Sequence, residues 1–117
     1  MGSVTVNGSG TWLDYYVNPD QVPMVEAEAI FELLGNDLVT ERSPAGIRLT
    51  VNGHVVEASM DGVRSTRVTF DGGEASGMNL LVYCVNDTVY ISTDVLAMFG
   101  YACQVDGNTL MVQATGN

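Results

Sequence analysis

The fold of this chain is decided by the stretch Val85-Asn86-Asp87-Thr88-Val89-Tyr90-Ile91-Ser92-Thr93-Asp94-Val95-Leu96-Ala97-Met98-Phe99-Gly100-Tyr101. The stretch predicts, in order, a turn, a short strand, a short helix, a glycine stop and a second strand. Ser92 or Thr93 can cap the helix, and Asp94 suits its positively polarised first turn. Gly100 is suited to end the helix because glycine accepts the left-handed backbone found there. This pattern describes architecture and carries no catalytic signature.

A looser copy of the same unit lies earlier, between Val17 and Gly35. Pro23 is suited to open its helix, since the first helical turn needs no N–H. Apolar residues then recur at the spacing of one buried helical stripe: Ala27, Ile30, Phe31 and Leu34. The sequence therefore predicts two strand-helix-strand repeats, the first within residues 4–58 and the second within 59–114.

Composition indicates one folded domain over residues 1–117. The chain is 46% hydrophobic and only 15% charged, which argues against disorder. It has 14 carboxylates, four basic residues and a net charge of −10. This charge disfavours nucleic acid and anionic membranes as partners. No apolar run approaches the roughly 18 residues that a spanning helix needs, so we expect no membrane insertion, and Met1-Gly2-Ser3 does not open a recognisable signal peptide.

The clearest predicted hairpin turns at Asn52-Gly53, a dipeptide typical of type I′ turns. A two-residue turn fixes the register. On one face of this hairpin, apolar residues then lie opposite each other or opposite the histidine. On the other face, Arg48 lies opposite Glu57. The full set of expected partners is Val51–His54, Leu49–Val56, Ile47–Ala58, Arg48–Glu57 and Thr50–Val55.

Further strands are expected on both sides of the second helix. Arg64–Phe70 alternates, which places Thr66, Val68 and Phe70 on one face. The nearly continuous apolar run Leu80–Val85 indicates a strand covered on both faces. A last hairpin is expected about Asp106-Gly107-Asn108, with these side chains inward: Tyr101, Cys103, Val105, Leu110 and Val112.

Aromatic residues supply the candidate ligand-binding site. Trp12, Tyr15 and Tyr16 lie on one predicted strand and can stack on a sugar ring or a peptide; Tyr90 or Tyr101 can extend the set. The competing interpretation is core and cross-strand packing, because aromatic side chains dominate the buried area of a small domain. Exposure of the three side chains decides between the two.

Catalytic and metal-binding patterns are not recognisable. His54 is the only histidine, and a general base or a metal site needs partners that the sequence does not place beside it. Glu26, Glu28 and Glu32 fit a solvated helix face better than a cation site, which usually takes its ligands from a folded loop. We therefore expect no catalytic residues, no metal and no cofactor; a small hydrolase using His54 is the least favoured alternative.

The two cysteines, Cys84 and Cys103, flank the second helix. In an oxidising compartment they could pair and close a loop of about 20 residues, a constraint worth ~3 kcal/mol. They could equally be two buried thiols that behave as small apolar groups. No Cys-x-x-Cys motif is present, which disfavours zinc and thioredoxin-type chemistry.

The two repeats resemble those of copper amine oxidase N-terminal-like domains. The resemblance lies in Asn86–Ser92 followed by Leu96–Tyr101, and in the earlier segments Gln21–Met24 and Glu32–Gly35. The closing hairpin of that family is similar to Val105-Asp106-Gly107 and Thr109–Val112. Thr50–Gly53 and Phe70–Gly72 resemble its Asn-Gly and Asp-Gly turns. The similarity covers roughly residues 4–114.

This resemblance implies an α+β fold, in which an antiparallel meander sheet carries two short helices on one face. It also implies a non-catalytic stalk-like module, because the chain has neither the three histidine copper ligands nor the Asn-Tyr-Asp/Glu motif of the amine oxidase centre. By analogy we expect an interaction or spacer module of a bacterial secreted or cell-surface protein. The alternative is a glycan- or peptide-binding domain. A cell-wall component, another protein domain or a second copy of the chain are the expected partners.

Overall fold

The computed structural model describes residues 2–75 and 79–114, which form many short strands and two short helices. The helices are α1 (Ala27–Leu33) and α2 (Thr93–Met98). The strands are β1 (Gly2–Val6), β2 (Ser9–Val17), β3 (Pro23–Glu26), β4 (Leu38–Ser43), β5 (Gly46–Val51), β6 (His54–Asp61), β7 (Arg64–Phe70), β8 (Gly73–Glu74), β9 (Val82–Val85), β10 (Thr88–Ser92), β11 (Tyr101–Asp106) and β12 (Thr109–Ala114).

The strands follow the order β11-β12-β1-β2-β3-β10-β9-β7-β6-β5-β4, and β8 pairs with β7 beside this path. The α+β class is correct, but the expected antiparallel meander is wrong because the sheet is mixed. Strand β1 runs parallel to β12, with Val4 beside Leu110 and Val6 beside Val112. A parallel pair between the first and last strands depends on contacts between the two ends of the sequence. No local turn motif in the sequence predicts such a pair.

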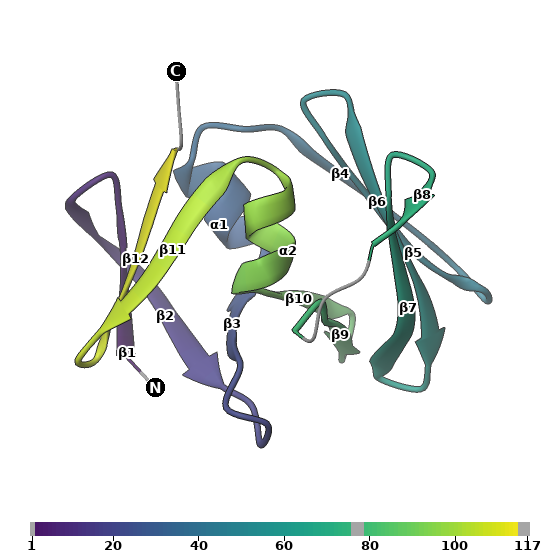
Figure 1. Ribbon diagram of the computed structural model, residues 1–117, viewed down its shortest axis with the longest axis horizontal. Helices are drawn as coiled ribbons and strands as arrows, with labels where there is room; N and C mark the ends of the chain where they lie inside the picture. Colours follow the sequence, from purple (N-terminus) through teal and green to yellow (C-terminus); the bar gives the residue numbers. More distant parts are fainter. Residues whose placement is uncertain (1, 76–78, 115–117) are drawn as a thin grey trace.

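The two strand-helix units meet at the centre of the sheet. Strands β3 and β10 pair antiparallel, with Val25 opposite Ile91, and each strand runs directly into its helix. After α1 the chain reaches β4 at one end of the sheet, whereas after α2 it reaches β11 at the other end (Figure 1). The two units therefore exchange strands: each helix carries the chain out of its own half of the sheet and into the opposite half.

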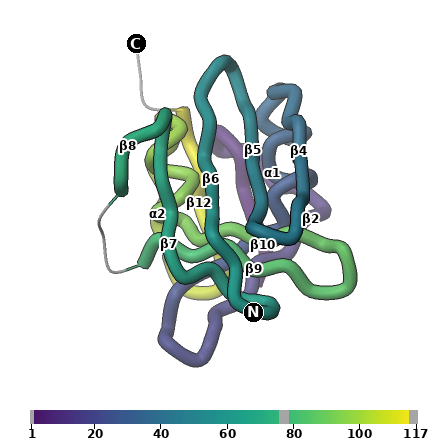
Figure 2. Tube along the Cα trace, turned by 90° about the vertical axis from the view of Figure 1, so that its right-hand side faces the viewer, coloured from purple at the N-terminus to yellow at the C-terminus, as the bar shows by residue number. Residues whose placement is uncertain are grey.

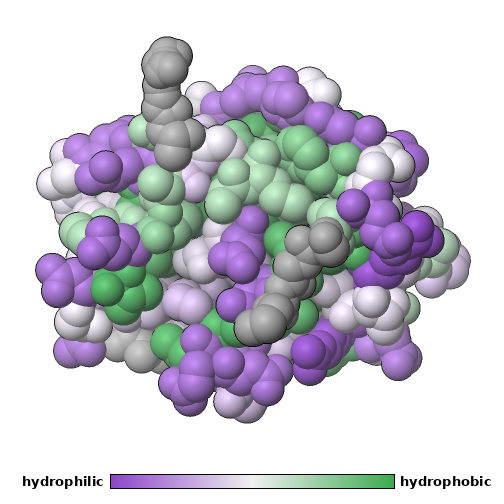
Figure 3. Space-filling model, viewed as in Figure 1, coloured by the Kyte–Doolittle hydropathy of each residue, from purple (hydrophilic) through white to green (hydrophobic). Residues whose placement is uncertain are grey.

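The core lies on the face of the sheet that the helices cover. Both helices contact the central strands β3 and β10, and the two ends of the sheet lie on either side of them (Figures 1 and 2). The largest fully buried side chains of this core come from both halves and both helices: Phe31, Ile30, Leu49, Ile91, Leu96 and Leu110. Apolar surface shows over α2 (Figure 3), where Met98 and Phe99 are only half buried. One continuous core thus holds the two units together.

Helix α1 begins four residues later than the position of Pro23 predicts. Pro23–Glu26 is strand β3, held between β2 and β10. Proline is tolerated there because it is the first residue of the strand. The buried stripe is confirmed for Ala27, Ile30 and Phe31. The left-handed stop is confirmed as well, since Gly35 has φ +81°.

Helix α2 has the predicted cap. The Ser92 side-chain oxygen accepts a hydrogen bond from the Val95 N–H at 3.4 Å and another from the Leu81 N–H at 3.1 Å. The same hydroxyl donates to the backbone carbonyl of Asn79, and the Ser92 side chain is fully buried. One serine therefore starts the helix and also fixes the segment that leads into β9.

The Asn52-Gly53 hairpin has the predicted register throughout. Asn52 and Gly53 have φ +53° and +81°, as a type I′ turn requires, and all five expected partners face each other. Arg48 and Glu57 form the predicted ion pair, with Nη2 and Oε2 3.0 Å apart.

Three strand predictions are wrong in part. A register shift between Ser59 and Met60 turns β7, so Ser65 is buried and Thr66 is exposed. Strand β9 is shorter than expected, and Val85 is 40% exposed because it precedes the turn into β10. Val105 is 43% exposed because β11 lies at the end of the sheet, whereas Leu110 and Val112 are buried as predicted.

Candidate functional site

The three candidate aromatic residues on β2 do not share one face. Trp12 is 68% exposed, whereas Tyr15 is 4% exposed and belongs to the main core. Successive side chains of a strand point to opposite faces, so Tyr16 lies on the outer side while Tyr15 points inward. Trp12 lies four residues before Tyr16, in the part of β2 where the register with β1 shifts. Tyr15 is therefore removed from the candidate site.

Two further tyrosines join Tyr16 on the outside of the sheet. Tyr16 pairs with Met24 on β3, and Tyr90 on β10 pairs with Tyr83 on β9. The rings of Tyr16 and Tyr90 meet edge to face, with centroids 5.4 Å apart. We refer to Trp12, Tyr16, Tyr83 and Tyr90 as the outer aromatic face.

A small second core supports this face from below. Met24, Val22 and Leu81 are buried and form a cluster separate from the main core, with the three tyrosines packed against it. Because each tyrosine is only half buried, the rings are held by packing and still reach solvent. The central strands are thus covered on both faces, by the helices on the inside and by the tyrosines on the outside.

The Tyr83 hydroxyl is positioned by a polar contact. Asn18, which is 2% exposed, donates its side-chain N–H to the Tyr83 hydroxyl at 3.1 Å. The side-chain oxygen of Asn18, Oδ1, accepts hydrogen bonds from the Asp20 and Val22 N–H groups, both at 2.9 Å. The pKa of Tyr16 is raised, first by burial and then by the nearby phenols of Tyr83 and Tyr90. The Tyr16 hydroxyl therefore stays protonated at neutral pH and remains a donor.

Carboxylates lie among these rings. Asp14 is the alternate residue between Trp12 and Tyr16, and Glu26 lies opposite Tyr90 in the strand pair. Aromatic rings pack on apolar C–H surfaces, while phenols and carboxylates exchange hydrogen bonds with hydroxyl groups. With a net charge of −10, the surface suits a neutral ligand rich in hydroxyls and disfavours an anionic one.

Tyr101 is not part of the outer aromatic face. Its hydroxyl accepts a hydrogen bond from the Asn36 side-chain N–H, and its ring lies 6.5 Å from that of Phe31. It packs with the main core, on the side of the helices. Of the two aromatic residues expected to extend the site, only Tyr90 does so.

His54 has a partner that the sequence did not reveal. Its Nδ1 lies 2.7 Å from Asp71 Oδ2, and its ring stacks on Phe70 with centroids 5.4 Å apart. The Asp71 pKa is lowered, mainly by the His54 hydrogen bond and then by the Val55 N–H, which donates to Oδ1 at 2.7 Å. Within residues 2–75 and 79–114, no serine, threonine or cysteine side chain is hydrogen bonded to His54. The pair therefore ties two neighbouring turns together.

The possible disulfide is absent from this structure. Cys84 and Cys103 are free, and they lie on β9 and β11, in opposite halves of the sheet. Cys84 Sγ lies 3.9 Å from Arg42 Nη1, which also pairs with Asp87 at 2.7 Å. Burial, with a smaller contribution from Asp94, raises the pKa of the Cys103 thiol to about 11. The interpretation as two separate thiols describes this structure.

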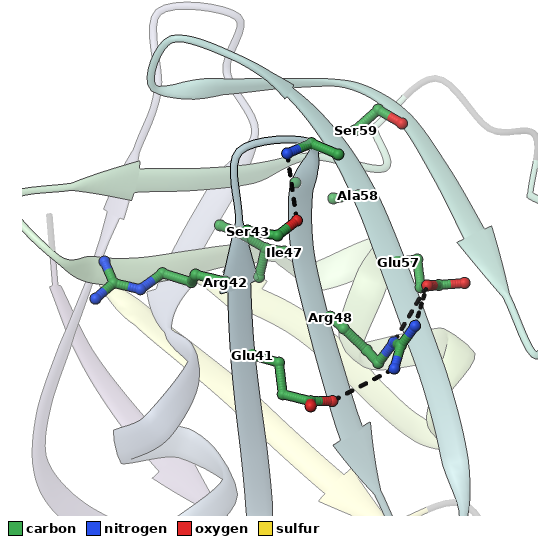
Figure 4. Close-up of a pocket in the computed structure, with 10 residues that line it drawn as sticks. Glu41, Arg42, Ser43, Ile47, Arg48, Glu57, Ala58 and Ser59 are labelled. Carbon is green, nitrogen blue, oxygen red and sulfur yellow. Dashed lines mark hydrogen bonds and ion pairs between the residues drawn. The ribbon is translucent and has the colours of Figure 1, made fainter.

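A cavity of about 350 Å³ lies over β4, β5 and β6 (Figure 4). Arg48 crosses it and contacts Glu57 at 3.0 Å and Glu41 at 3.5 Å. Gly46 is required at its rim, since a Cβ there would lie 2.0 Å from the Ala58 carbonyl oxygen. Glu41, Arg48 and Glu57 pair with one another, and Arg42, which also lines the cavity, pairs with Asp87 outside it. These contacts indicate a structural ion-pair cluster.

Residues 2–75 and 79–114 contain no group of three or more histidine, cysteine, aspartate or glutamate side chains able to hold a metal ion. Over the same residues, neither helix has the length and apolar character needed to cross a membrane.

Comparisons with models of protein families, with curated proteins and with solved structures find no match to this chain.

Proposed function

We propose that this chain is a non-catalytic interaction module of a bacterial secreted or cell-surface protein, similar to the stalk domain of copper amine oxidases. Two observations support the proposal. The repeats form matched strand-helix units that meet at β3 and β10. The chain also presents Trp12 to solvent, 68% exposed, on the strand that carries Tyr16.

The exposed Trp12 carries the argument for binding over a purely passive spacer. A large aromatic side chain left in water indicates a contact surface when other aromatic groups adjoin it. Trp12 lies on the same strand as Tyr16, four residues before it, and Tyr16 contacts Tyr90. The module therefore has one surface on which a partner can gain apolar contact.

We propose a neutral glycan chain, such as a cell-wall polysaccharide, as the ligand of this face. The tyrosine rings and Trp12 supply stacking surfaces, and Asp14 and Glu26 supply acceptors for sugar hydroxyls. The excess of acidic residues disfavours anionic polymers, so neutral chains are favoured over acidic ones.

The test is a pull-down on insoluble cell-wall polysaccharide combined with a glycan array. Trp12→Ala is expected to weaken binding by about tenfold or more, as for a central aromatic contact. Val39→Ala is the matched control, because Val39 is also an exposed apolar strand residue, 55% exposed, but lies on β4. Equal effects of the two substitutions, or no binding of the intact chain to any glycan, would refute the glycan proposal and leave the spacer interpretation.

The hydrolase alternative has a separate test. His54→Ala is expected to change no activity in a hydrolase screen, because His54 is hydrogen bonded to Asp71 in a turn. Hydrolysis by the intact chain that His54→Ala abolishes would contradict the non-catalytic proposal.

A further inference from the structure

The open edge of β11 is the basis of a second inference. Within residues 2–75 and 79–114, β11 pairs only with β12 and stands at one end of the strand order. Its register with β12 runs without a shift from Tyr101–Ala114 to Asp106–Thr109. An edge strand of this kind presents unpaired N–H and C=O groups to any strand that can reach it.

The register shows which groups face outward. Asp106 and Thr109 flank the two-residue turn, so they form a hydrogen-bonded pair. Hydrogen-bonded pairs alternate along the ladder, so the backbone groups of Gln104 and Ala102 also bond to β12. The backbone N–H and C=O groups of Tyr101, Cys103 and Val105 therefore point to the open side.

The two ends of the sheet are protected differently. β11 carries no proline and no bulge, and its one charged residue, Asp106, lies at the turn end of the strand. The opposite edge, β4, carries Glu41 and Arg42, and Arg42 forms an ion pair with Asp87. Charged side chains on an edge strand discourage pairing with another strand. Of the two strands that end the described sheet, β11 carries fewer charged residues than β4.

We propose that β11 is the site at which two copies of this chain pair as an antiparallel dimer. The outward-facing residues are self-complementary when Cys103 lies on the two-fold axis. Tyr101 of each copy then lies opposite Val105 of the other copy. Every outward N–H then meets an outward C=O. In this register the Asp106 carboxylates of the two copies lie at opposite ends of the shared ladder.

The charge of the chain determines how such a dimer responds to salt. Each copy carries a net charge of −10, so the two copies repel each other at low ionic strength. Pairing through one short strand also buries less surface than a stable interface needs. The dimer is therefore weak, and it becomes stronger as salt is added. An interface built on ion pairs would show the opposite response.

Sedimentation velocity of the intact chain, from micromolar to millimolar concentration and at low and half-molar sodium chloride, tests this proposal. Val105→Pro removes an outward N–H while leaving the β11–β12 ladder intact, because that N–H does not bond to β12. We expect dimerisation to weaken by about tenfold or more. Thr40→Pro is the matched control: its N–H faces the open side of β4 by the same register argument, and dimerisation should not change.

Val105→Glu provides a second variant if the proline variant does not fold, since Val105 is 43% exposed and accepts a polar side chain. It should also weaken the dimer, by adding charge at the edge. A monomer at every concentration and salt level would overturn the proposal. So would a dimer that withstands both Val105 substitutions, or one that Thr40→Pro weakens equally.

Discussion

The two strand-helix units follow the same path but are fixed by different contacts. Helix α1 starts after Glu26 without a side-chain cap and buries Ala27, Ala29, Ile30 and Phe31. Helix α2 is capped by Ser92 and buries only Val95 and Leu96. The first unit is therefore held mainly by apolar burial, whereas the second depends on one buried polar anchor. A repeat can keep its shape while the source of its stability changes.

Replacement of Phe31 should have the largest effect. Phe31 is fully buried and packs edge to face against Phe99, which follows α2, at 5.2 Å. Phe31→Ala should lower the free energy of unfolding by about 3–5 kcal/mol, through lost apolar transfer and a residual cavity. Urea denaturation measures this change. Leu96→Ala, in α2, should lower the free energy of unfolding by less than Phe31→Ala does. An equal or larger decrease would contradict the view that apolar burial stabilises mainly the first unit.

The polar anchor of the second unit is tested by Ser92→Ala. The substitution removes the helix cap and leaves the Leu81 N–H and the Asn79 carbonyl without their Ser92 partner. We expect a loss of about 1–3 kcal/mol in urea denaturation. Glu26→Ala, at the equivalent capping position of α1, should change stability by only about 0.5 kcal/mol or less, because no side-chain cap is lost.

Two matching turns extend the comparison to pH. In the Asn7-Gly8 turn, the Asn7 N–H donates to the Val112 carbonyl, and Asn7 Oδ1 accepts from the Ala114 N–H. In the Asp71-Gly72 turn, the Asp71 N–H donates to the Val55 carbonyl, and Asp71 Oδ1 accepts from the Val55 N–H. Only the second turn carries a charge and adds His54. The Asp71 pKa is lowered in the folded state, so its contribution is present above the unfolded value of 3.8 and is lost as pH falls through the folded value.

Asp71→Asn should therefore make the unfolding free energy less dependent on pH below about 4, where the unfolded carboxyl begins to titrate. Urea midpoints measured from neutral to acidic pH give this slope. Asn7→Ala is the control, since it should lower stability without altering the slope. A wild-type slope retained by Asp71→Asn would show that other carboxylates cause the acid sensitivity.

The smallest expected effect is chemical and concerns Cys103. Its pKa of about 11 leaves very little thiolate at neutral pH, and the thiolate is the reactive form. In a Cys84→Ser background, iodoacetamide labelling of Cys103 should be slow at pH 7 and should accelerate about tenfold per pH unit below the pKa. In urea, the unfolded chain should be labelled at Cys103 faster than the folded chain at pH 7. A labelling rate that levels off near pH 8 in the folded chain would contradict the raised pKa of Cys103.

Local signals predicted much of this fold. The Asn52-Gly53 turn gave all the partners of its hairpin, and Ser92, Gly35 and Gly100 marked helix ends correctly. These features depend on a few neighbouring residues whose backbone preferences agree with the hydrophobic pattern.

Features that depend on distant contacts could not be predicted. Pro23 suits a helix start and also the first residue of a strand, and only the pairing of β3 with β10 and β2 decides between them. The alternation along β2 could have separated Tyr15 from Trp12, but Tyr83 and Tyr90 join the outer aromatic face only through the order of the strands. The His54 contact likewise needs Asp71, 17 residues away in another turn.

The parallel pairing of β1 with β12 determines how the chain responds to mechanical tension. β1 begins at one end of this pair and β12 finishes at the other, as Figure 1 shows. A force applied at the start of β1 and the end of β12 therefore slides the two strands along each other. All the hydrogen bonds between Ser3–Val6 and Thr109–Val112 are loaded together, instead of opening one after another. The chain should therefore resist tension applied along this pair better than a hairpin whose hydrogen bonds open singly.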